Sequence, residues 1–269
     1  MLTASIVIYD SPLAQVEEAL RCIVRSGADR VWIVFNGPDG SLFASLRSLA
    51  SVIGQERIEV LCCANRGFGA GHNIAMRRAL EAGADYHLVA NADIRWEGDA
   101  VTPLREYMDT HPDTALTSPE TVYPDGSPQY TARMLPNPLQ LFTRRFLPRL
   151  CRRADDRYQL KDLDLSRPVD APYLLGCFML LRCEALRQEG LFDERFFMYP
   201  EDIDLTRRLH RRWRTLRLPL SRIIHDHARA SRTSLRMLRI HLVNMARYFN
   251  KWGWLRDPER KEFNSRLRR

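Results

Sequence analysis

An abrupt change from apolar to polar residues constrains the fold of this chain more than any other feature. The mostly apolar run from Tyr86 to Ala90 is followed at once by Asn91-Ala92-Asp93. This pattern is typical of a buried parallel strand whose carboxyl end delivers a carboxylate into a ligand crevice. We therefore expect Asp93 to lie beside the substrate.

A glycine-rich segment precedes that strand. Residues 65–73 read NRGFGAGHN, between a predicted strand near Val60 to Cys63 and a predicted helix. Three glycines within five residues let backbone amides approach a ligand closely, and the start of a helix favours an anion. Together with Asp93, this segment predicts a nucleotide diphosphate held with a metal ion.

Strand and helix patterns alternate four times in the first half of the chain. Buried strands are predicted at residues 5–9, 31–35, 58–62 and 86–90, and helices at 13–24, at 42–53 and through Met76 and Leu80. This alternation predicts an α/β fold with a mostly parallel sheet and helices on both faces. Ligands of such folds bind at the carboxyl ends of the strands.

The composition changes after a predicted helix at residues 103–109. Seven prolines punctuate residues 112–148, and Tyr123 to Ser127 has the composition of a hairpin turn. We interpret residues 151–168 as a mobile surface segment and Tyr173 to Leu181 as a strand that returns to the core. The predicted domains are a doubly wound half at 1–118, a second half at 119–230, and a basic helical segment at 231–269; the resemblance described below implies that the first binds a nucleotide sugar and that the second binds the acceptor and carries the catalysis.

Charge and cysteine usage restrict the class of protein. The formal net charge is +8, and residues 205–269 hold 19 Lys and Arg against four Asp and Glu. Six cysteines without a CxxC pair suggest neither a disulfide framework nor a zinc module. No apolar run approaches the roughly 20 residues that a spanning helix needs. We expect a cytoplasmic protein, with the inner face of the cell membrane as a candidate docking surface for its basic end.

Two further groups of polar residues could carry chemistry. Pro200 at a helix start places Glu201 and Asp202 in the first turn, where the helix dipole favours ionised carboxylates. An ionised carboxylate can act as a base, although acidic residues at this position can also simply cap the helix. His225, in His225-Asp226-His227, could complete a metal site with Asp93 or could be an ordinary strand histidine.

The order of these pieces resembles a family 2 glycosyltransferase of the GT-A fold, in the bacterial rhamnosyltransferase-like branch. The matching segments span residues 5–227 and occur in the family's order. They are IVIYDSP at 6–12, Asn36-Gly37, NRGFGAGHN at 65–73, ANAD at 90–93, GCFML at 176–180, FDERFFMYPEDIDL at 192–205, and His225.

This resemblance implies roles for individual residues. Asp93 matches the last carboxylate of the family's Asp-x-Asp signature, which holds a divalent cation, Mg²⁺ or Mn²⁺, on the donor diphosphate. Asn91 stands where the family has the first carboxylate, which weakens the expected metal affinity. His225 matches a histidine beside the metal, and Asp202 matches the general base.

The resemblance also implies a nucleotide-sugar pocket and an acceptor site. The expected nucleotide-sugar contacts are Tyr9, Asp10, Asn36, Asn65, Gly67, Phe68, Gly71, Asn73, Asn91 and Asp93. Phe35 departs from the pattern, because many relatives have an acidic residue there that meets the base. We expect Glu201 and Tyr199 to contact the acceptor.

The chemistry of transfer agrees with these roles. A nucleotide diphosphate leaves readily only when its developing charge is neutralised, and a sugar hydroxyl needs a base. One carboxylate base without an enzyme nucleophile predicts a single displacement and inversion at the anomeric carbon. We therefore expect an inverting transferase, with dTDP-rhamnose favoured as donor, that acts on a glycan or lipid-linked glycan in bacterial surface polysaccharide synthesis.

The basic end of the chain predicts an amphipathic helix. Apolar residues recur there every three or four positions, at Leu235, Leu238, Leu242, Met245, Phe249 and Trp252. Arg and Lys occupy the opposite side. This helix could dock on the protein core, insert at an anionic membrane surface, or do both, with Arg256, Arg260, Lys261, Arg266, Arg268 and Arg269 facing lipid.

Two other classes of function remain as alternatives. A nucleic-acid-binding protein could use the basic end, although no known binding module accompanies it and the acidic first half would repel phosphates. A catalytically silent nucleotide-sugar-binding protein is the other alternative, favoured if Asn91 abolishes metal binding.

Overall fold

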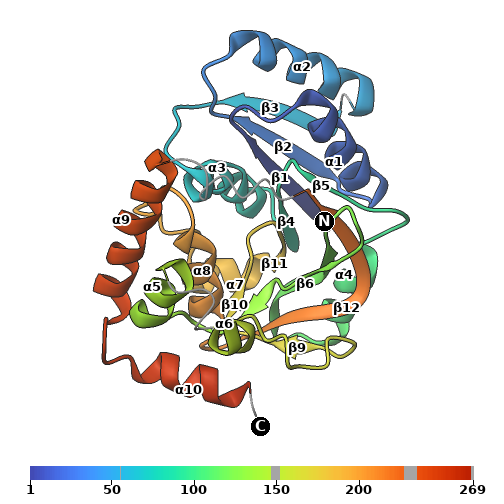
Figure 1. The fold of residues 1–269 in the computed structure, drawn as a ribbon. Coiled ribbons are helices and arrows are strands. Elements are labelled where there is room, and N and C mark those ends of the chain that lie inside the picture. The colour runs from blue at the N-terminus through green and yellow to red at the C-terminus, as the bar shows by residue number, and fades with distance from the viewer. Residues whose placement is uncertain (55, 147–151, 227–234, 268–269) are drawn as a thin grey trace.

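The computed structural model describes residues 1–269 except 55, 147–151, 227–234 and 268–269. Its first half alternates strands and helices as predicted (Figure 1). In chain order these elements are β1 (Leu2–Ile8), α1 (Leu13–Arg25), β2 (Arg30–Phe35), α2 (Gly40–Gly54), β3 (Ile58–Cys62), α3 (Phe68–Glu81) and β4 (Tyr86–Ala90).

The second half contains shorter strands between helices. They are β5 (Ile94–Arg95), α4 (Thr102–Thr110), β6 (Thr114–Val122), β7 (Pro128–Gln129), β8 (Ala132–Arg133), α5 (Pro138–Phe146), α6 (Arg152–Tyr158), β9 (Val169–Asp170), β10 (Tyr173–Leu174), β11 (Phe178–Arg182), α7 (Cys183–Glu189), α8 (Pro200–Leu209), β12 (Arg214–His225), α9 (Leu235–Trp252) and α10 (Pro258–Arg266).

One mixed sheet organises both halves, in the order β3-β2-β1-β4-β11-β6-β12-β5. The first four of these strands are parallel, whereas β11 runs antiparallel to both β4 and β6. β6 runs through residue 118, so the sheet is continuous across the predicted boundary between the first two domains. The antiparallel strand β11 brings residues 176–178 to the carboxyl end of β4, beside Asn91 and Asp93.

Helices cover both faces of the sheet, because successive strand residues point to opposite sides. On one face, Ile6 and Ile8 pack with Leu20 of α1 and Leu46 of α2. On the other face, α3, α7 and α8 bury apolar residues such as Met76 and Leu205. The predicted α/β class, with helices on both faces of a mostly parallel sheet, is confirmed.

Local predictions in the second half had mixed outcomes. The hairpin turn at Tyr123 is confirmed, since its N–H donates to Ser127 O at 2.8 Å and β6 pairs with β7. The mobile segment predicted from residue 151 is wrong for its described part, because α6 forms and buries Tyr158. The single strand predicted for residues 173–181 is split into β10 and β11.

The C-terminal segment forms two helices, α9 and α10, that dock on the second half of the chain (Figure 1). Met245, Tyr248 and Phe249 of α9 are buried, and α10 buries Phe263. Arg207 of α8 binds Asp257 through a buried ion pair of 2.6 Å. Removing one member of such a pair typically costs about 3–5 kcal/mol. Docking is therefore confirmed for the second half of α9 and for α10.

Candidate active site

Asp93 and His225 meet at the carboxyl ends of β4 and β12. His225 Nε2 lies 3.3 Å from Asp93 Oδ1, and the Asp226 N–H donates to Asp93 O at 2.9 Å. Pairing of β12 with the short strand β5 creates this contact, since His225 lies opposite Ile94. Two residues separated by 132 positions thus present one carboxylate and one imidazole side by side.

The surroundings of this pair fix its charge. Burial alone would raise the pKa of Asp93, but hydrogen bonds and charge from His225, together with the Asn91 side chain, lower it overall. Burial lowers the pKa of His225, whereas Cys177 and Asp93 raise it, with a net value of about 10. Asp93 is therefore held ionised, and Asn91, in place of a carboxylate, hydrogen-bonds to it.

Gln129 orients His225, which the sequence did not indicate. Gln129 Oε1 lies 2.8 Å from His225 Nδ1, and Gln129 Nε2 donates to His225 O at 3.0 Å. This double contact fixes the imidazole with Nε2 toward Asp93. Gln129 belongs to β7, a strand of two residues without periodicity, so no sequence signal pointed to it.

Glu201 and Asp202 lie in the first turn of α8 and are 4% and 8% exposed. Asp202 Oδ2 accepts the Gly176 N–H at 3.1 Å, and Asp202 Oδ1 accepts the Ile203 N–H at 2.8 Å. By contrast, no donor among the described residues reaches Glu201 Oε2. The two adjacent carboxyl groups therefore have different environments.

This difference separates their acidities. Burial raises the pKa of Asp202 to about 7, although the two N–H groups and the charge of Arg133 lower it. Burial and the neighbouring Asp202 raise the pKa of Glu201 well above its ordinary value. The two backbone N–H groups stabilise the ionised form of Asp202, whereas Glu201 has a raised pKa and no described donor at Oε2, so Asp202 is the better candidate for the ionised member of the pair. A carboxylate with a pKa near 7 is suited to accept a proton at that pH.

Residues 176 and 177 connect the two carboxylate sites. The Gly176 N–H binds Asp202, while the Cys177 side chain interacts with His225 and its carbonyl accepts the Asn91 N–H at 2.9 Å. A Cβ on Gly176 would lie 3.3 Å from Asp202 Cβ, so the backbone passes close to this carboxylate. Asp93, His225 and Asp202 thus gather around one turn of chain.

The glycine-rich segment lies against the same helix, but its glycines make room for protein atoms. Gly67 has a φ of 104°, and a Cβ there would lie 2.0 Å from Phe197 O. A Cβ on Gly71 would lie 2.8 Å from Val7 Cγ2. These two positions require glycine through packing, which corrects the interpretation that they mainly admit a ligand.

Four further expected nucleotide contacts, Tyr9, Asp10, Asn36 and Asn65, follow β1, β2 and β3. Tyr9 and Asp10 are exposed beyond β1, and Asn36, beyond β2, is buried with an exposure of 6%. Asn36 Nδ2 lies 3.4 Å from Asn65 Oδ1, while no described donor reaches Asn36 Oδ1. These residues therefore border the carboxyl ends of the parallel strands, where ligands of such sheets bind.

Other expected contacts have protein partners. Asn73 binds the backbone of Phe192 at 2.9 and 3.0 Å and also reaches Glu194. Phe68 packs edge-to-face on His72 at 4.4 Å, and Tyr199 packs on His241 of α9 at 4.8 Å. Tyr199 also has a φ of 93°, which is uncommon outside glycine. These contacts position the loop before α8.

Phe35 and His72 belong to the interior. Phe35 is 2% exposed and packs on Phe43 of α2, with ring centroids 5.6 Å apart. His72 contacts Ser5 at 2.7 Å, and Ser5 contacts His87 at 2.8 Å. Burial lowers the pKa of His72 well below its ordinary value. This buried, neutral network connects His72 of the glycine-rich segment to β1 and β4.

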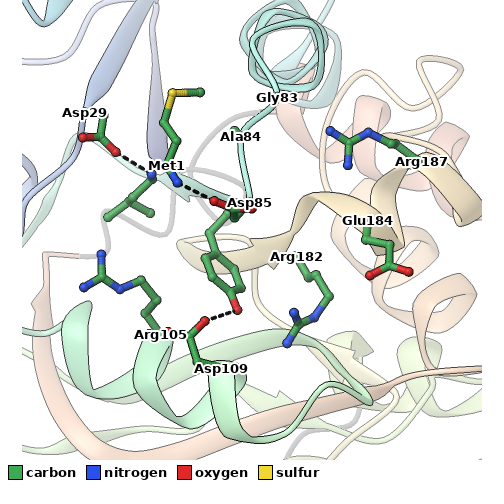
Figure 2. Close-up of a pocket in the computed structure, with 12 residues that line it drawn as sticks. Met1, Asp29, Gly83, Ala84, Asp85, Arg105, Asp109, Arg182, Glu184 and Arg187 are labelled. Carbon is green, nitrogen blue, oxygen red and sulfur yellow. Dashed lines mark hydrogen bonds and ion pairs between the residues drawn. The ribbon is translucent and has the colours of Figure 1, made fainter.

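A cavity elsewhere contains none of the expected site residues. This cavity has a volume of about 660 Å³, and Met1, Tyr86 and Arg182 are among the residues that line it. Figure 2 shows the lining residues as sticks. Met1, Tyr86 and Arg182 mark the amino ends of β1 and β4 and the carboxyl end of β11. Asp93 follows the carboxyl end of β4, so the cavity lies at the opposite end of that strand.

Comparisons with known proteins now assign the family. The model of a family described as Glycosyl transferase family 2 matches residues 4–190. The chain belongs to this family. A relative from Mycobacterium tuberculosis, N-acetylglucosaminyl-diphospho-decaprenol L-rhamnosyltransferase, is 31% identical over 180 residues, which are 62% of this chain and 58% of the relative. The chain thus matches less than two thirds of that relative's length, and the expected likeness to rhamnosyltransferases is confirmed.

Solved glycosyltransferases share the fold of this family 2 protein. A mannosyltransferase from Pyrobaculum calidifontis in complex with GDP-Man and Mn²⁺ has a TM-score of 0.62 at 16% identity, over 98% of this chain and 68% of its own. GalNAc-T7 with UDP, GalNAc and Mn²⁺ has a TM-score of 0.63 at 13% identity, over 84% and 43%. S. aureus TarS has a TM-score of 0.60 at 13% identity, over 99% and 42%. The GT-A fold is confirmed.

Proposed function

We propose that this family 2 glycosyltransferase moves a sugar, with rhamnose from dTDP-rhamnose favoured, to a glycan or lipid-linked glycan and inverts the anomeric carbon. The observation that carries the proposal is the convergence of the Asp93–His225 pair and Asp202 around Gly176 and Cys177. The sugar to be transferred would then lie between these groups, with the donor diphosphate beside Asp93 and His225 and the acceptor hydroxyl beside Asp202. The role in bacterial surface polysaccharide synthesis follows from the likeness to the rhamnosyltransferase relative.

The residues present fit a divalent cation that also binds the substrate. Asp93 offers an oxygen ligand, and His225 Nε2, 3.3 Å away, would become a nitrogen ligand once the ion displaces its proton, because the raised pKa keeps the imidazole protonated without the ion. The described residues contain no cluster of three such groups. Mg²⁺ and Mn²⁺ accept one or two protein ligands when substrate phosphates and water complete the set. Asp93 and His225 would hold the ion, which would supply positive charge to the leaving diphosphate.

Asp202 would take the proton of the acceptor hydroxyl. Its carboxylate is oriented by two backbone N–H groups, and its pKa near 7 leaves much of it ionised at neutral pH. Glu201 would remain neutral and donate a hydrogen bond to the acceptor. The arrangement contains a base and needs no covalent intermediate, which gives inversion.

The donor and acceptor are supported by chemistry and by the relative. Asn36 offers a buried carbonyl oxygen without a described donor, which an N–H of a nucleotide base could satisfy. The relative's name specifies rhamnosyl transfer and an acceptor sugar joined through a diphosphate to decaprenol. A rhamnosyl donor and a lipid-linked acceptor are therefore the first substrates to test.

A lipid-linked acceptor would bring the protein to a membrane, and α9 offers a suitable surface. No helix of the described residues is both long and apolar enough to span a bilayer. Leu235, Leu242 and Val243 are nevertheless 85%, 57% and 44% exposed. Arg236 and Arg239 are exposed beside them. We propose that this half of α9 contacts anionic lipid. The expectation that Arg260 faces lipid is wrong. Its Nη1 lies 3.9 Å from Asp257 Oδ2 and 3.4 Å from Pro136 O.

Vesicle binding tests the membrane contact. Leu242→Glu combined with Val243→Glu should weaken binding to vesicles that contain phosphatidylglycerol by about tenfold, since it removes apolar contact and adds negative charge. Val52→Glu is the matched control, because Val52 is 76% exposed on the distant helix α2. Equal vesicle binding by wild type and the double variant would refute this contact.

A substrate panel tests the function itself. Nucleotide sugars should be screened for thermal stabilisation and for transfer, each with and without Mn²⁺. We expect dTDP-rhamnose with Mn²⁺ to give the largest shift and to support transfer to a lipid-linked GlcNAc diphosphate. Donor binding without transfer or hydrolysis would favour the silent binding protein. Absence of binding by every nucleotide sugar would overturn the proposal.

A further inference from the structure

A second cationic group lies next to the proposed base. Arg133 on β8 pairs with Tyr173 on β10, and its guanidinium carbon is 5.9 Å from the ring centroids of both Tyr158 and Tyr173. Its Nε donates to Tyr130 O at 3.2 Å. Two aromatic rings and a carbonyl therefore hold this side chain.

The backbone connects Arg133 to Asp202 in two steps. The Leu175 N–H donates to Thr131 O at 3.0 Å, and the next N–H, of Gly176, donates to Asp202. The charge of Arg133 lowers the pKa of Asp202, and the charge of Asp202 raises the pKa of Arg133. Strand β8, which carries Arg133, and its partner β10 thus lie beside the turn that binds Asp202.

Arg133 also differs from Arg207, a buried arginine of the same half. Arg207 has two carboxylate partners within 2.7 Å, Asp257 and Glu259. Among the described residues, Arg133 has no carboxylate oxygen within the 4.0 Å of an ion pair, although it is only partly exposed. A shielded cation without an ion-pair partner is costly, and an anionic ligand would relieve that cost.

We propose that Arg133 binds the phosphate group of an acceptor whose reacting sugar is carried on a phosphate or diphosphate. The proposal rests on the function proposed above and deepens it by naming the acceptor's anionic subsite. The hydroxyl to be glycosylated would lie at Asp202 and the anomeric phosphate at Arg133, with one sugar ring between them. Tyr158 and Tyr173 would line the same subsite.

Two acceptors with the same sugar separate this role from others. The first is GlcNAc diphosphate on a short lipid, and the second is a neutral alkyl glycoside of GlcNAc. Arg133→Met should raise KM for the diphosphate acceptor about 10- to 100-fold, the loss expected for one charged hydrogen-bonding group. KM for the neutral glycoside should change less than about threefold, and Arg133→Lys should restore part of the diphosphate affinity.

Lys161→Met provides the matched control. Lys161 lies over the Tyr130 ring at 5.3 Å but already pairs with Asp156 at 2.8 Å, so its loss should leave both KM values unchanged. Equal losses by Arg133→Met with the two acceptors, or no loss with either, would overturn the subsite. Because the charge of Arg133 lowers the pKa of Asp202, Arg133→Met should also move the pH profile of kcat to higher pH with both acceptors, so the two KM values are compared on the plateau of the profile.

Binding without turnover separates the two proposals. Calorimetry with the GlcNAc diphosphate lipid should show weaker binding by Arg133→Met than by wild type, while nucleotide-sugar binding stays unchanged. If wild type binds this acceptor but transfers no sugar, the proposed function fails and the subsite stands. If wild type transfers sugar and Arg133→Met binds the diphosphate acceptor normally, the subsite fails alone.

Discussion

Two carboxylates at the same crevice have opposite electrostatic environments. Asp93 lies beside His225, and the pKa of Asp93 is lowered. Asp202 lies in a buried helix turn next to another acid, and its pKa is raised to about 7. The first group is set to remain a negative ligand, and the second is set to gain and lose a proton. In the proposed function, the donor diphosphate would lie beside Asp93 and the acceptor hydroxyl beside Asp202.

The largest expected effect breaks the acceptor side. Asp202→Asn should lower kcat about 10²- to 10⁴-fold, because the amide cannot accept the hydroxyl proton. Nucleotide-sugar affinity, measured by calorimetry, should remain within about twofold of wild type, since the contacts of Asp93 are unchanged. Substantial turnover by this variant would remove Asp202 from the role of base.

The next effect breaks the donor side. Asp93→Asn should weaken donor binding in the presence of Mn²⁺ at least about tenfold, because one charged ligand is lost. The same titration with a chelator is the control and should show a smaller difference between variant and wild type. An equal difference with and without Mn²⁺ would mean that Asp93 does not act through a metal.

The pH dependence sharpens the comparison. Transfer requires ionised Asp202, so kcat should rise with pH through about 7 and be roughly tenfold below its plateau at pH 6. A carboxylate with an ordinary pKa would give a flat profile there. Donor binding measured at each pH assigns the change to kcat or to KM. A flat kcat between pH 5 and 8 would contradict the raised pKa.

Gln129 tests the support of the metal pair. Gln129→Leu removes both contacts with His225 and should weaken Mn²⁺-dependent donor binding by about tenfold, the lower end for residues that orient a metal ligand. The matched control is Gln140→Leu, a change outside the site on α5. Unchanged donor affinity in Gln129→Leu would show that His225 needs no such orientation.

The smallest effect is expected at the neighbour of the base. Burial and the neighbouring Asp202 raise the pKa of Glu201 and so favour its protonated form, which Glu201→Gln mimics; this variant should change kcat less than about threefold. Glu201→Ala measures the loss of the whole side chain in the same assay. A loss by Glu201→Gln as large as that by Asp202→Asn would exchange the two roles.

The donor half could be predicted from sequence, and much of the acceptor half could not. Strands β1 to β4 are mostly apolar segments that are followed by polar residues, so both their existence and the position of Asp93 follow from the pattern. Gln129 and Arg133 lie on strands of two residues and contact His225 and Tyr173, which are 96 and 40 positions away, respectively. No local periodicity can encode such distant pairing.

The helical pattern alone also did not show which part of α9 packs on the protein. The apolar positions of α9 look equivalent in sequence, yet Met245 and Phe249 are buried whereas Leu235 and Leu242 are exposed. The difference arises because α8 and the loop before it cover only part of the helix, where Asn244 Nδ2 donates to Met198 O at 3.0 Å. Periodicity shows that a helix has an apolar face but not how much of that face is covered.

The stereochemistry of the product most directly tests the two roles proposed for the carboxylates, Asp202 as the base and Asp93 as a ligand of the cation on the diphosphate. Nuclear magnetic resonance should determine the anomeric configuration of the freshly transferred sugar and compare it with that of the donor. A base at Asp202 and a cation-bound diphosphate at Asp93 predict inversion in a single displacement. Retention of configuration would contradict the account, because it would require a covalent intermediate or another path.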